Sequence, residues 1–272
     1  MVRNLLGRRL GPVTAMQTIM LLLYSQSILS FSHDTGCSPS PWALPFYFMN
    51  PFFAMVWQTG VIYYFSDAPF LQQNEMYRMA RMGRKRWFWE RLGILAVKSL
   101  FLILTEIALS IFFLMPQRPD PADGWGSLFY TFSMSNAVLQ YNSMASFPYE
   151  FLVKYSPLEA ILLLLGVGWL LTWFTAILMA AVSCLAGRAA AMGIAAGLAL
   201  FVVAERNISM RMPEALFVSP VSWLNLNRLG EEAGRQVPVV WALGALAAGI
   251  ICLAFFWKRA LEKRDIFWQK EE

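Results

Sequence analysis

The chain has 272 residues, of which 58% are hydrophobic and only 14% are charged, with a formal net charge of +5. A soluble domain of this length does not need so much apolar side chain for its core, so the composition excludes an ordinary soluble enzyme and indicates an integral membrane protein. The basic residues lie beside apolar segments, which is typical of membrane orientation and of contact with anionic lipids, and not of nucleic-acid binding. Since a spanning helix needs about 20 residues, residues 1–272 have room for roughly six spans in one transmembrane domain.

The first apolar segment follows Arg3, Arg8 and Arg9, a beginning that an uncleaved helix shares with a secretory signal peptide. We expect it to stay in the protein, because the residues before Cys37 lack the aliphatic side chain of a lipoprotein signal and the chain remains apolar afterwards. The predicted spans are residues 13–31, 46–65, 92–115, 158–185, 189–204 and 238–257.

The fourth span has the clearest start. Ser156, Pro157 and Glu159 predict a capped helix in which proline takes the first position and the Ser and Glu side chains form a capping box. Gly187-Arg188 is the only interruption before the fifth span, so we predict a tight turn there between antiparallel helices. Without that turn the chain would have five spans, and the fifth span, at about 24 Å, is shorter than the roughly 30 Å hydrocarbon core.

The distribution of Lys and Arg predicts the orientation, because basic residues near span ends resist translocation. Most of them fall on the side of both termini and of residues 66–91, which we expect to be the cytosolic side of a bacterial plasma membrane. The two outer loops, 116–157 and 205–237, mix aromatic and apolar residues, which predicts either short helices on the outer membrane face or plain surface loops. The outer side receives only Arg118, Lys154, Arg206, Arg211, Arg228 and Arg235.

Residues 66–91, between the second and third spans, predict an interfacial helix. Ser66 or Asp67 can cap it, and its opposite faces are apolar and arginine-rich. Trp87 and Trp89 then anchor the third span at the interface. The helix serves either as a membrane anchor without a partner or as a docking element for a soluble subunit. We expect a bend at Gly83, at the end of this helix. The apolar positions, at spacings of three and four, are Met76, Met79, Ala80 and Gly83.

The layout of six spans, cytosolic termini, an interfacial helix and a sizeable outer loop resembles the permease subunit of type-2 ABC exporters, and residues 75–91 resemble the stretch that precedes the third span in that family. The resemblance implies export of a peptide, lipid or drug-like substrate, a second permease copy or paralogue, and a separate cytosolic ATP-binding cassette subunit. ATP would bind that partner and this chain would hold no cofactor; it contains no GxxxxGK[ST] phosphate-binding loop. The residues implied in coupling to the ATPase are Glu75, Arg78, Arg81 and Arg84.

Two charged residues lie inside the predicted third span. Glu106 is near its middle, where a carboxylate either meets a cationic substrate group or a proton, or is a protonated acid bonded to a neighbouring helix. Lys98 is nearer the cytosolic end, and we expect it to reach the lipid headgroups. Small residues at Gly193, Gly197 and Gly249 allow close helix packing, which we expect within one subunit; the alternative is a seam between two permeases.

Enzyme chemistry is not expected. His33 is the only histidine, which excludes a membrane protease with paired zinc-binding histidines, and no GxSxG nucleophile motif or metal site is present. Two functions remain open: an ABC exporter permease, and a membrane binding or immunity protein that acts without ATP. The second would not need the basic interfacial helix.

Overall fold

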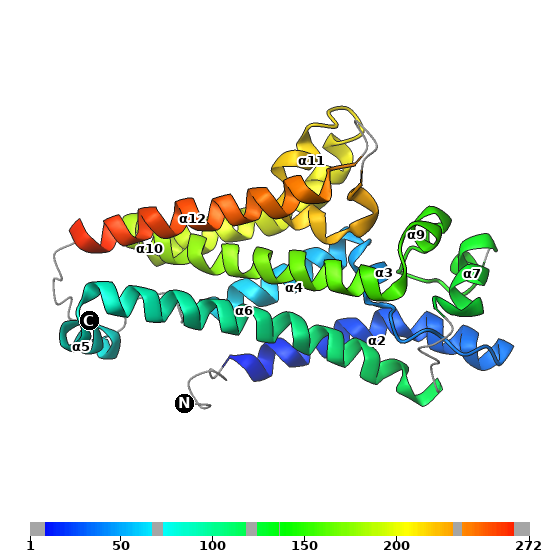
Figure 1. Ribbon diagram of the computed structural model, residues 1–272. Coiled ribbons are helices and arrows are strands. Elements are labelled where there is room, and N and C mark those ends of the chain that lie inside the picture. Colours follow the sequence, from blue (N-terminus) through cyan, green and yellow to red (C-terminus); the bar gives the residue numbers. More distant parts are fainter. Residues whose placement is uncertain (1–8, 67–72, 118–123, 136, 231–235, 264–272) are drawn as a thin grey trace.

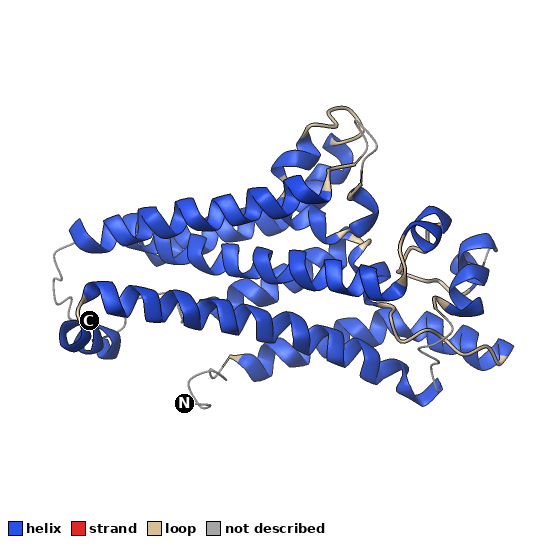
Figure 2. Cartoon of the chain, in the orientation of Figure 1, coloured by secondary structure: helices blue, strands red, loops and turns tan. Residues whose placement is uncertain are grey.

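The computed structural model describes residues 9–66, 73–117, 124–135, 137–230 and 236–263. Over these ranges helices are joined by loops and turns, and the one β-bridge links Leu229 and Val237 (Figure 2). The prediction of an all-helical fold is confirmed, and several helices are long and apolar enough to span a membrane, whereas the six spans and their topology stay predictions. The helices that are long and apolar enough to cross a membrane are α2 (Leu10–Thr35), α6 (Arg84–Leu114), α10 (Pro157–Ile208) and α12 (Val239–Lys263).

These long helices run side by side as one bundle (Figure 1). One end of the bundle carries α5 (Gln73–Met82), and we call it the α5 end. The opposite end carries the short helices of the long connections, and we call it the loop end. Its helices include α3 (Leu44–Phe48), α7 (Gly126–Met134), α9 (Tyr149–Lys154) and α11 (Ala215–Val218).

α10 is a hairpin of two limbs. Gly187 has non-helical backbone angles (φ +88°, ψ 174°), and the chain reverses there (Figure 1). Both limbs reach the 3-10 helix η2 (Pro220–Leu224): a Cβ on Gly168 would lie 3.8 Å from Leu224, while Glu205 accepts a hydrogen bond from Ser222. The turn predicted at Gly187-Arg188 is therefore present. The capping box of Ser156 and Glu159 at the start of α10 is also confirmed.

The second limb of α10 is longer than the sequence predicts. It continues to Ile208 instead of ending at residue 204, so residues 188–208 extend over about 31 Å. The prediction stops the apolar helix at Glu205 because the residue is charged. In the structure Glu205 is buried and pairs with Arg228, which allows the helix to continue past it.

The predicted second span, residues 46–65, is wrong as a single helix. It is divided into α3 and α4 (Pro51–Phe65), because the Asn50 side chain accepts a hydrogen bond from the Phe52 amide and Pro51 takes the first helical position. With 15 residues, α4 is about 22 Å long, shorter than a helix of about 20 residues that spans a membrane unaided.

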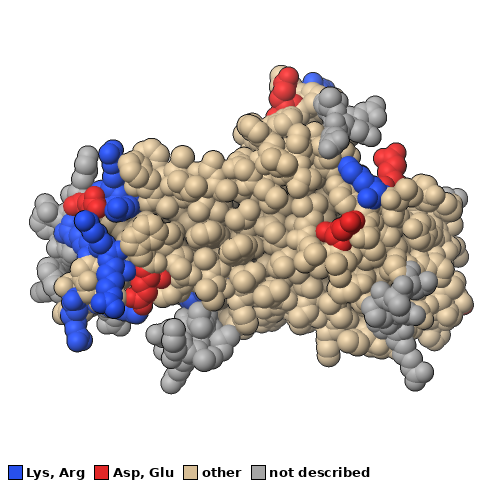
Figure 3. Space-filling view, viewed as in Figure 1, with Lys and Arg blue, Asp and Glu red and all other residues tan. Residues whose placement is uncertain are grey.

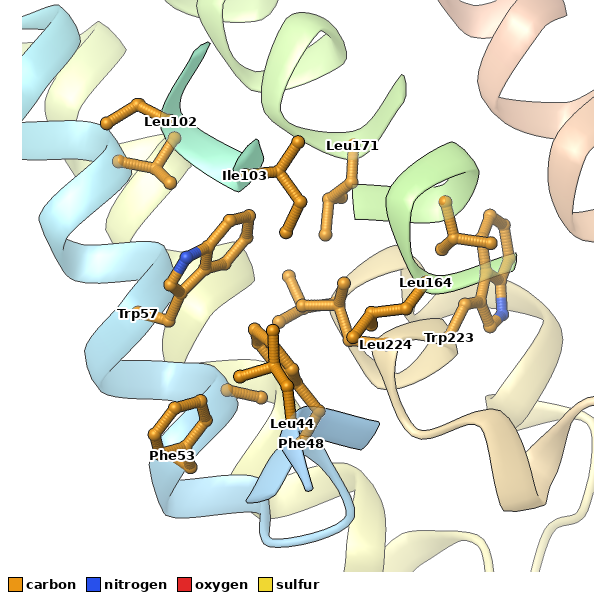
Figure 4. Close-up of a cluster of buried hydrophobic side chains, with 14 of the residues drawn as sticks. Leu44, Phe48, Phe53, Trp57, Leu102, Ile103, Leu164, Leu171, Trp223 and Leu224 are labelled. Carbon is orange, nitrogen blue, oxygen red and sulfur yellow. The ribbon is translucent and has the colours of Figure 1, made fainter. Parts of the chain in front are cut away.

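α4 lies in the core of the bundle. Phe53 and Trp57 of α4 are buried where α6, α10 and η2 meet (Figure 4). Within this region Gln58 donates a hydrogen bond of 2.8 Å to the hydroxyl of Thr175 in α10. The neighbouring helices contribute buried apolar side chains at Leu102, Ile103, Leu164, Leu171 and Leu224. The short helix η2 therefore belongs to the core and not to an outer loop surface.

An aromatic cluster closes the loop end. Phe46 of α3 is fully buried, and its ring centroid lies 4.9 to 5.5 Å from those of four rings in the connection between α6 and α10. These are the rings of Trp125, Phe129, Phe147 and Phe151. The short helices predicted as one possibility for residues 116–157 and 205–237 are present as η1 (Met115–Gln117), α7, α8 (Ala137–Gln140), α9, α11, η2 and η3 (Leu226–Arg228).

Candidate functional site

The α5 end is strongly basic. Lys and Arg side chains gather there over the ends of α5, α6 and α12 (Figure 3). Gly83 (φ +81°, ψ 147°) ends α5, so that α6 begins at the next residue in a new direction. Glycine adopts such positive φ angles without the steric cost that a side chain brings. The bend predicted at Gly83 is thus present, and α5 lies across the end of the bundle, with Met79 buried.

The predicted coupling residues have different surroundings. Arg78 forms an ion pair with Glu90 of α6. Arg84 donates to the carbonyl oxygens of Leu261 and Glu262 of α12, at 3.1 and 2.9 Å. Arg81 is exposed, while the side chain of Glu75 lies outside the described residues. Arg78 and Arg84 therefore hold α5, α6 and α12 together, and Arg81 is available to a partner.

The two charged residues predicted inside the third span, Lys98 and Glu106, are both buried in α6. Lys98 is 8% exposed, and its ammonium lies 5.8 Å from the centre of the Tyr64 ring, so the prediction that it extends to the surface is wrong. A cation over an aromatic face is stabilised there by the ring electrons. Glu106 is 1% exposed, and neither of its oxygens has a hydrogen-bond partner among the described residues. Among the described residues Glu106 therefore has no hydrogen bond to a neighbouring helix, and its contact with a cationic substrate group or a proton stays a prediction.

The small-residue positions divide into two groups. A Cβ on Gly249 of α12 would lie 2.8 Å from the Phe174 ring of α10, so this glycine permits close packing within the chain. Gly193 and Gly197 are exposed, and a Cβ on either would meet no heavy atom within 4 Å. The prediction of packing within one subunit is confirmed for Gly249 and wrong for Gly193 and Gly197. The buried face of that limb is formed instead by alanines such as Ala191, Ala195 and Ala199.

A polar cluster that the sequence analysis does not identify lies at the loop end. Glu205, at the end of α10, forms an ion pair with Arg228 of η3 and accepts a 2.7 Å hydrogen bond from the hydroxyl of Ser222. Ser222 in turn shares a 2.6 Å hydrogen bond with Ser219. Glu205 is 1% exposed and Arg228 24% exposed. The cluster lies on the wall of a cavity of about 470 Å³, within the range of small-molecule pockets.

The loop that carries Arg228 is held by Lys154, the last residue of α9, and by Tyr155, which follows it. Lys154 donates to the carbonyl of Leu229 and to the side-chain carbonyl of Gln236, both at 3.2 Å, and the Tyr155 hydroxyl donates to the Leu229 carbonyl at 3.1 Å. Burial and, to a smaller extent, the Glu159 carboxylate raise the pKa of Tyr155, so the hydroxyl keeps the proton that it donates. These contacts hold Arg228 where it pairs with Glu205.

No group of three His, Cys, Asp or Glu side chains in the described part of the chain is placed to hold a metal ion. No family model, no curated protein and no solved structure matches this chain.

Proposed function

We propose that the chain is the permease subunit of an ATP-binding cassette exporter in a plasma membrane, with six spans and both termini in the cytosol. The observation that supports this most is the placement of α5. It is a short amphipathic helix across the basic end of the bundle, with Arg81 and Tyr77 exposed. A soluble ATPase that binds α5 would be connected to two spans at once, because the Arg78–Glu90 pair links α5 to α6 and Arg84 links the start of α6 to α12.

The working unit would contain a second permease copy or paralogue. The exposed face of the second α10 limb supports this part of the proposal, because Gly193 and Gly197 leave a smooth surface that another helix can approach closely. The substrate would be a peptide, a lipid or a drug-like molecule, and ATP would bind the partner subunit only.

Co-purification tests the proposal. Affinity-tagged full-length protein is extracted from its native membrane in mild detergent, and ATP hydrolysis is measured in the eluate, together with the identity of the co-eluting chains. Arg81→Glu reverses an exposed charge on α5 and should remove most of the bound ATPase. The matched control is Arg211→Glu, which makes the same change at an exposed position at the loop end. Equal ATPase recovery from both variants would contradict docking on α5.

A membrane binding or immunity protein that acts without ATP is the second candidate. The cavity beside Glu205 favours it, since a binding protein needs such a site and no ATPase. Full function in a variant that carries Arg81→Glu, with no ATP-hydrolysing chain in the wild-type eluate, would support this candidate over the exporter.

A further inference from the structure

The cavity at the loop end has apolar walls and a charged rim. Pro51 and Ala54 of α4, Val202 of α10 and Phe147 are among its apolar walls. Its charged groups come from the end of α10 and from η3, and its amides from Asn50, Asn225 and Asn227. Phe52, beside Pro51, is 55% exposed, so apolar surface continues from the cavity wall to the outside of the bundle. This combination fits an amphipathic molecule and not a simple ion.

The polar part of the lining has unused hydrogen-bonding capacity of both kinds. Oε2 of Glu205 accepts from Arg228 and Ser222, but the buried Oε1 has no partner among the described residues. A buried carboxylate oxygen without a donor is costly, so a donor from a bound molecule would stabilise it. Arg206 is exposed at the same cavity and offers guanidinium donors to an anion. The lining therefore fits a ligand in which a hydrogen-bond donor lies next to an anionic group.

We propose that this cavity binds an amphipathic zwitterion, in which a primary ammonium donates to Glu205, an adjacent phosphate or carboxylate accepts from Arg206 and Arg228, and an apolar portion lies against Pro51, Ala54 and Val202. The described lining has two arginines and one glutamate, so an ammonium alone would be repelled by the arginines, and a ligand that also carries an anionic group is favoured. Phosphatidylethanolamine has this chemistry, and so do soluble aminophosphates and amino acids. The proposal does not depend on docking at α5, which lies at the other end of the bundle.

Native mass spectrometry of the detergent-solubilised full chain tests the proposal. The protein is titrated with dihexanoyl phosphatidylethanolamine, with dihexanoyl phosphatidylcholine, and with phosphoethanolamine. The choline headgroup has the same charge but no N–H, so it cannot donate to Glu205, and we expect it to bind about tenfold more weakly than the ethanolamine lipid. Phosphoethanolamine distinguishes a soluble ligand from a lipid. If it binds as tightly as dihexanoyl phosphatidylethanolamine, the ligand is a soluble zwitterion. If it binds more weakly, the ligand is a lipid.

Two variants test the residues. Arg206→Ala removes an exposed guanidinium and should weaken binding of the ethanolamine lipid by about tenfold, whereas Arg211→Ala, at an exposed position just after α10 and outside the cavity, should not change it. Glu205→Gln should remove the preference for ethanolamine over choline. Equal binding of the two lipids to the wild-type protein, or equal affinity of the Arg206→Ala and Arg211→Ala variants, would overturn the proposal even if Glu205→Gln does not fold.

Discussion

Glu205 is a carboxylate inside the protein, at the point where α10 ends and η2 and η3 pack against it. A charge that leaves water loses several kcal/mol of hydration, and only close opposite charges and hydrogen bonds can offset that loss. Arg228 and Ser222 provide both to the same oxygen. Arg228 is partly exposed, so its own loss of hydration is smaller than that of its partner. The stability of the loop end therefore depends on this pair.

Replacing Arg228 should show how much the stability of the loop end depends on its pair with Glu205. Arg228→Met keeps much of the side-chain volume but leaves Glu205 without its charge partner, and we expect the free energy of unfolding to fall by about 3 to 5 kcal/mol. Thermal unfolding of the detergent-solubilised protein measures the change. Adding Glu205→Gln to Arg228→Met should restore much of the loss, because the amide needs no counter-charge. Arg211→Met serves as the control and should leave the melting temperature unchanged. If Arg211→Met lowers the melting temperature as much as Arg228→Met does, the Arg228–Glu205 pair has no specific role in stability.

The sequence contains a weak signal that Glu205 lies on the buried face of its helix. Ala191, Ala195, Ala199 and Val202 are buried on one face of the second α10 limb, and Glu205 continues that spacing. Helical periodicity therefore places the carboxylate on the inner face, whereas hydropathy treats it as the end of the span. The partner could not be predicted, because Arg228 is 23 residues away across a loop and reaches Glu205 only through the packing of η2 and the contacts of Lys154.

At the scale of the elements, the hairpin of α10 depends on one backbone conformation. Gly187 combines φ +88° with ψ 174°, a region that is accessible almost only to glycine. The two limbs on either side are helical, so the reversal of direction is concentrated at this residue. Any side chain at position 187 has to be accommodated by strain or by movement of a limb.

Gly187→Ala should lower the free energy of unfolding by about 1 to 3 kcal/mol, the usual cost of a residue held in a forbidden backbone region. Gly166→Ala is the matched comparison, because Gly166 lies in the first limb of the same helix and a Cβ there would meet no heavy atom within 4 Å. Alanine favours helix over glycine by up to about 1 kcal/mol, so Gly166→Ala should raise stability slightly. Chemical unfolding in detergent compares the two; if Gly187→Ala is as stable as Gly166→Ala, the turn is not held at residue 187.

Element boundaries could be predicted where a local signal decides them. The Ser156 capping box and the Gly187 turn are such signals, and both predictions are confirmed. Asn50-Pro51 is a signal of the same kind, but it interrupts a run that is apolar on both sides, and hydropathy outweighs it. The predicted second span therefore merges α3 and α4. The inclusion of η2 in the core could not be predicted, because it follows from tertiary packing against α4 and α10.

At the scale of the whole molecule, the two candidate sites lie at opposite ends of the bundle, and a third surface lies along its side. The basic α5 end fits a soluble partner, and the cavity at the loop end fits a small ligand. The exposed limb with Gly193 and Gly197 is the surface that we propose for a second copy of the chain. Lys and Arg side chains gather at the α5 end (Figure 3), which is the end that our proposal places in the cytosol.

Pairing of two copies through this limb can be tested without disturbing the fold. Gly193→Leu combined with Gly197→Leu fills the smooth surface, and the open space around both glycines means that the isolated chain should unfold at a similar temperature. Its molecular mass in detergent, measured by light scattering after size exclusion, should shift from dimer to monomer. Gly244→Leu, at an exposed glycine of α12 with equally open space, is the control. A dimer that survives the double substitution would place the seam elsewhere.

The bonds from Arg84 to the end of α12 also set an order of assembly. Arg84 and its acceptor Leu261 are separated by 177 residues, so the first of them leaves the ribosome about 9 to 35 s before the second at ordinary translation rates. During that interval the start of α6 lacks the carbonyl acceptors that α12 provides. The surface around α5 is therefore completed only when the last long helix has been inserted, and an unfinished chain does not yet present it.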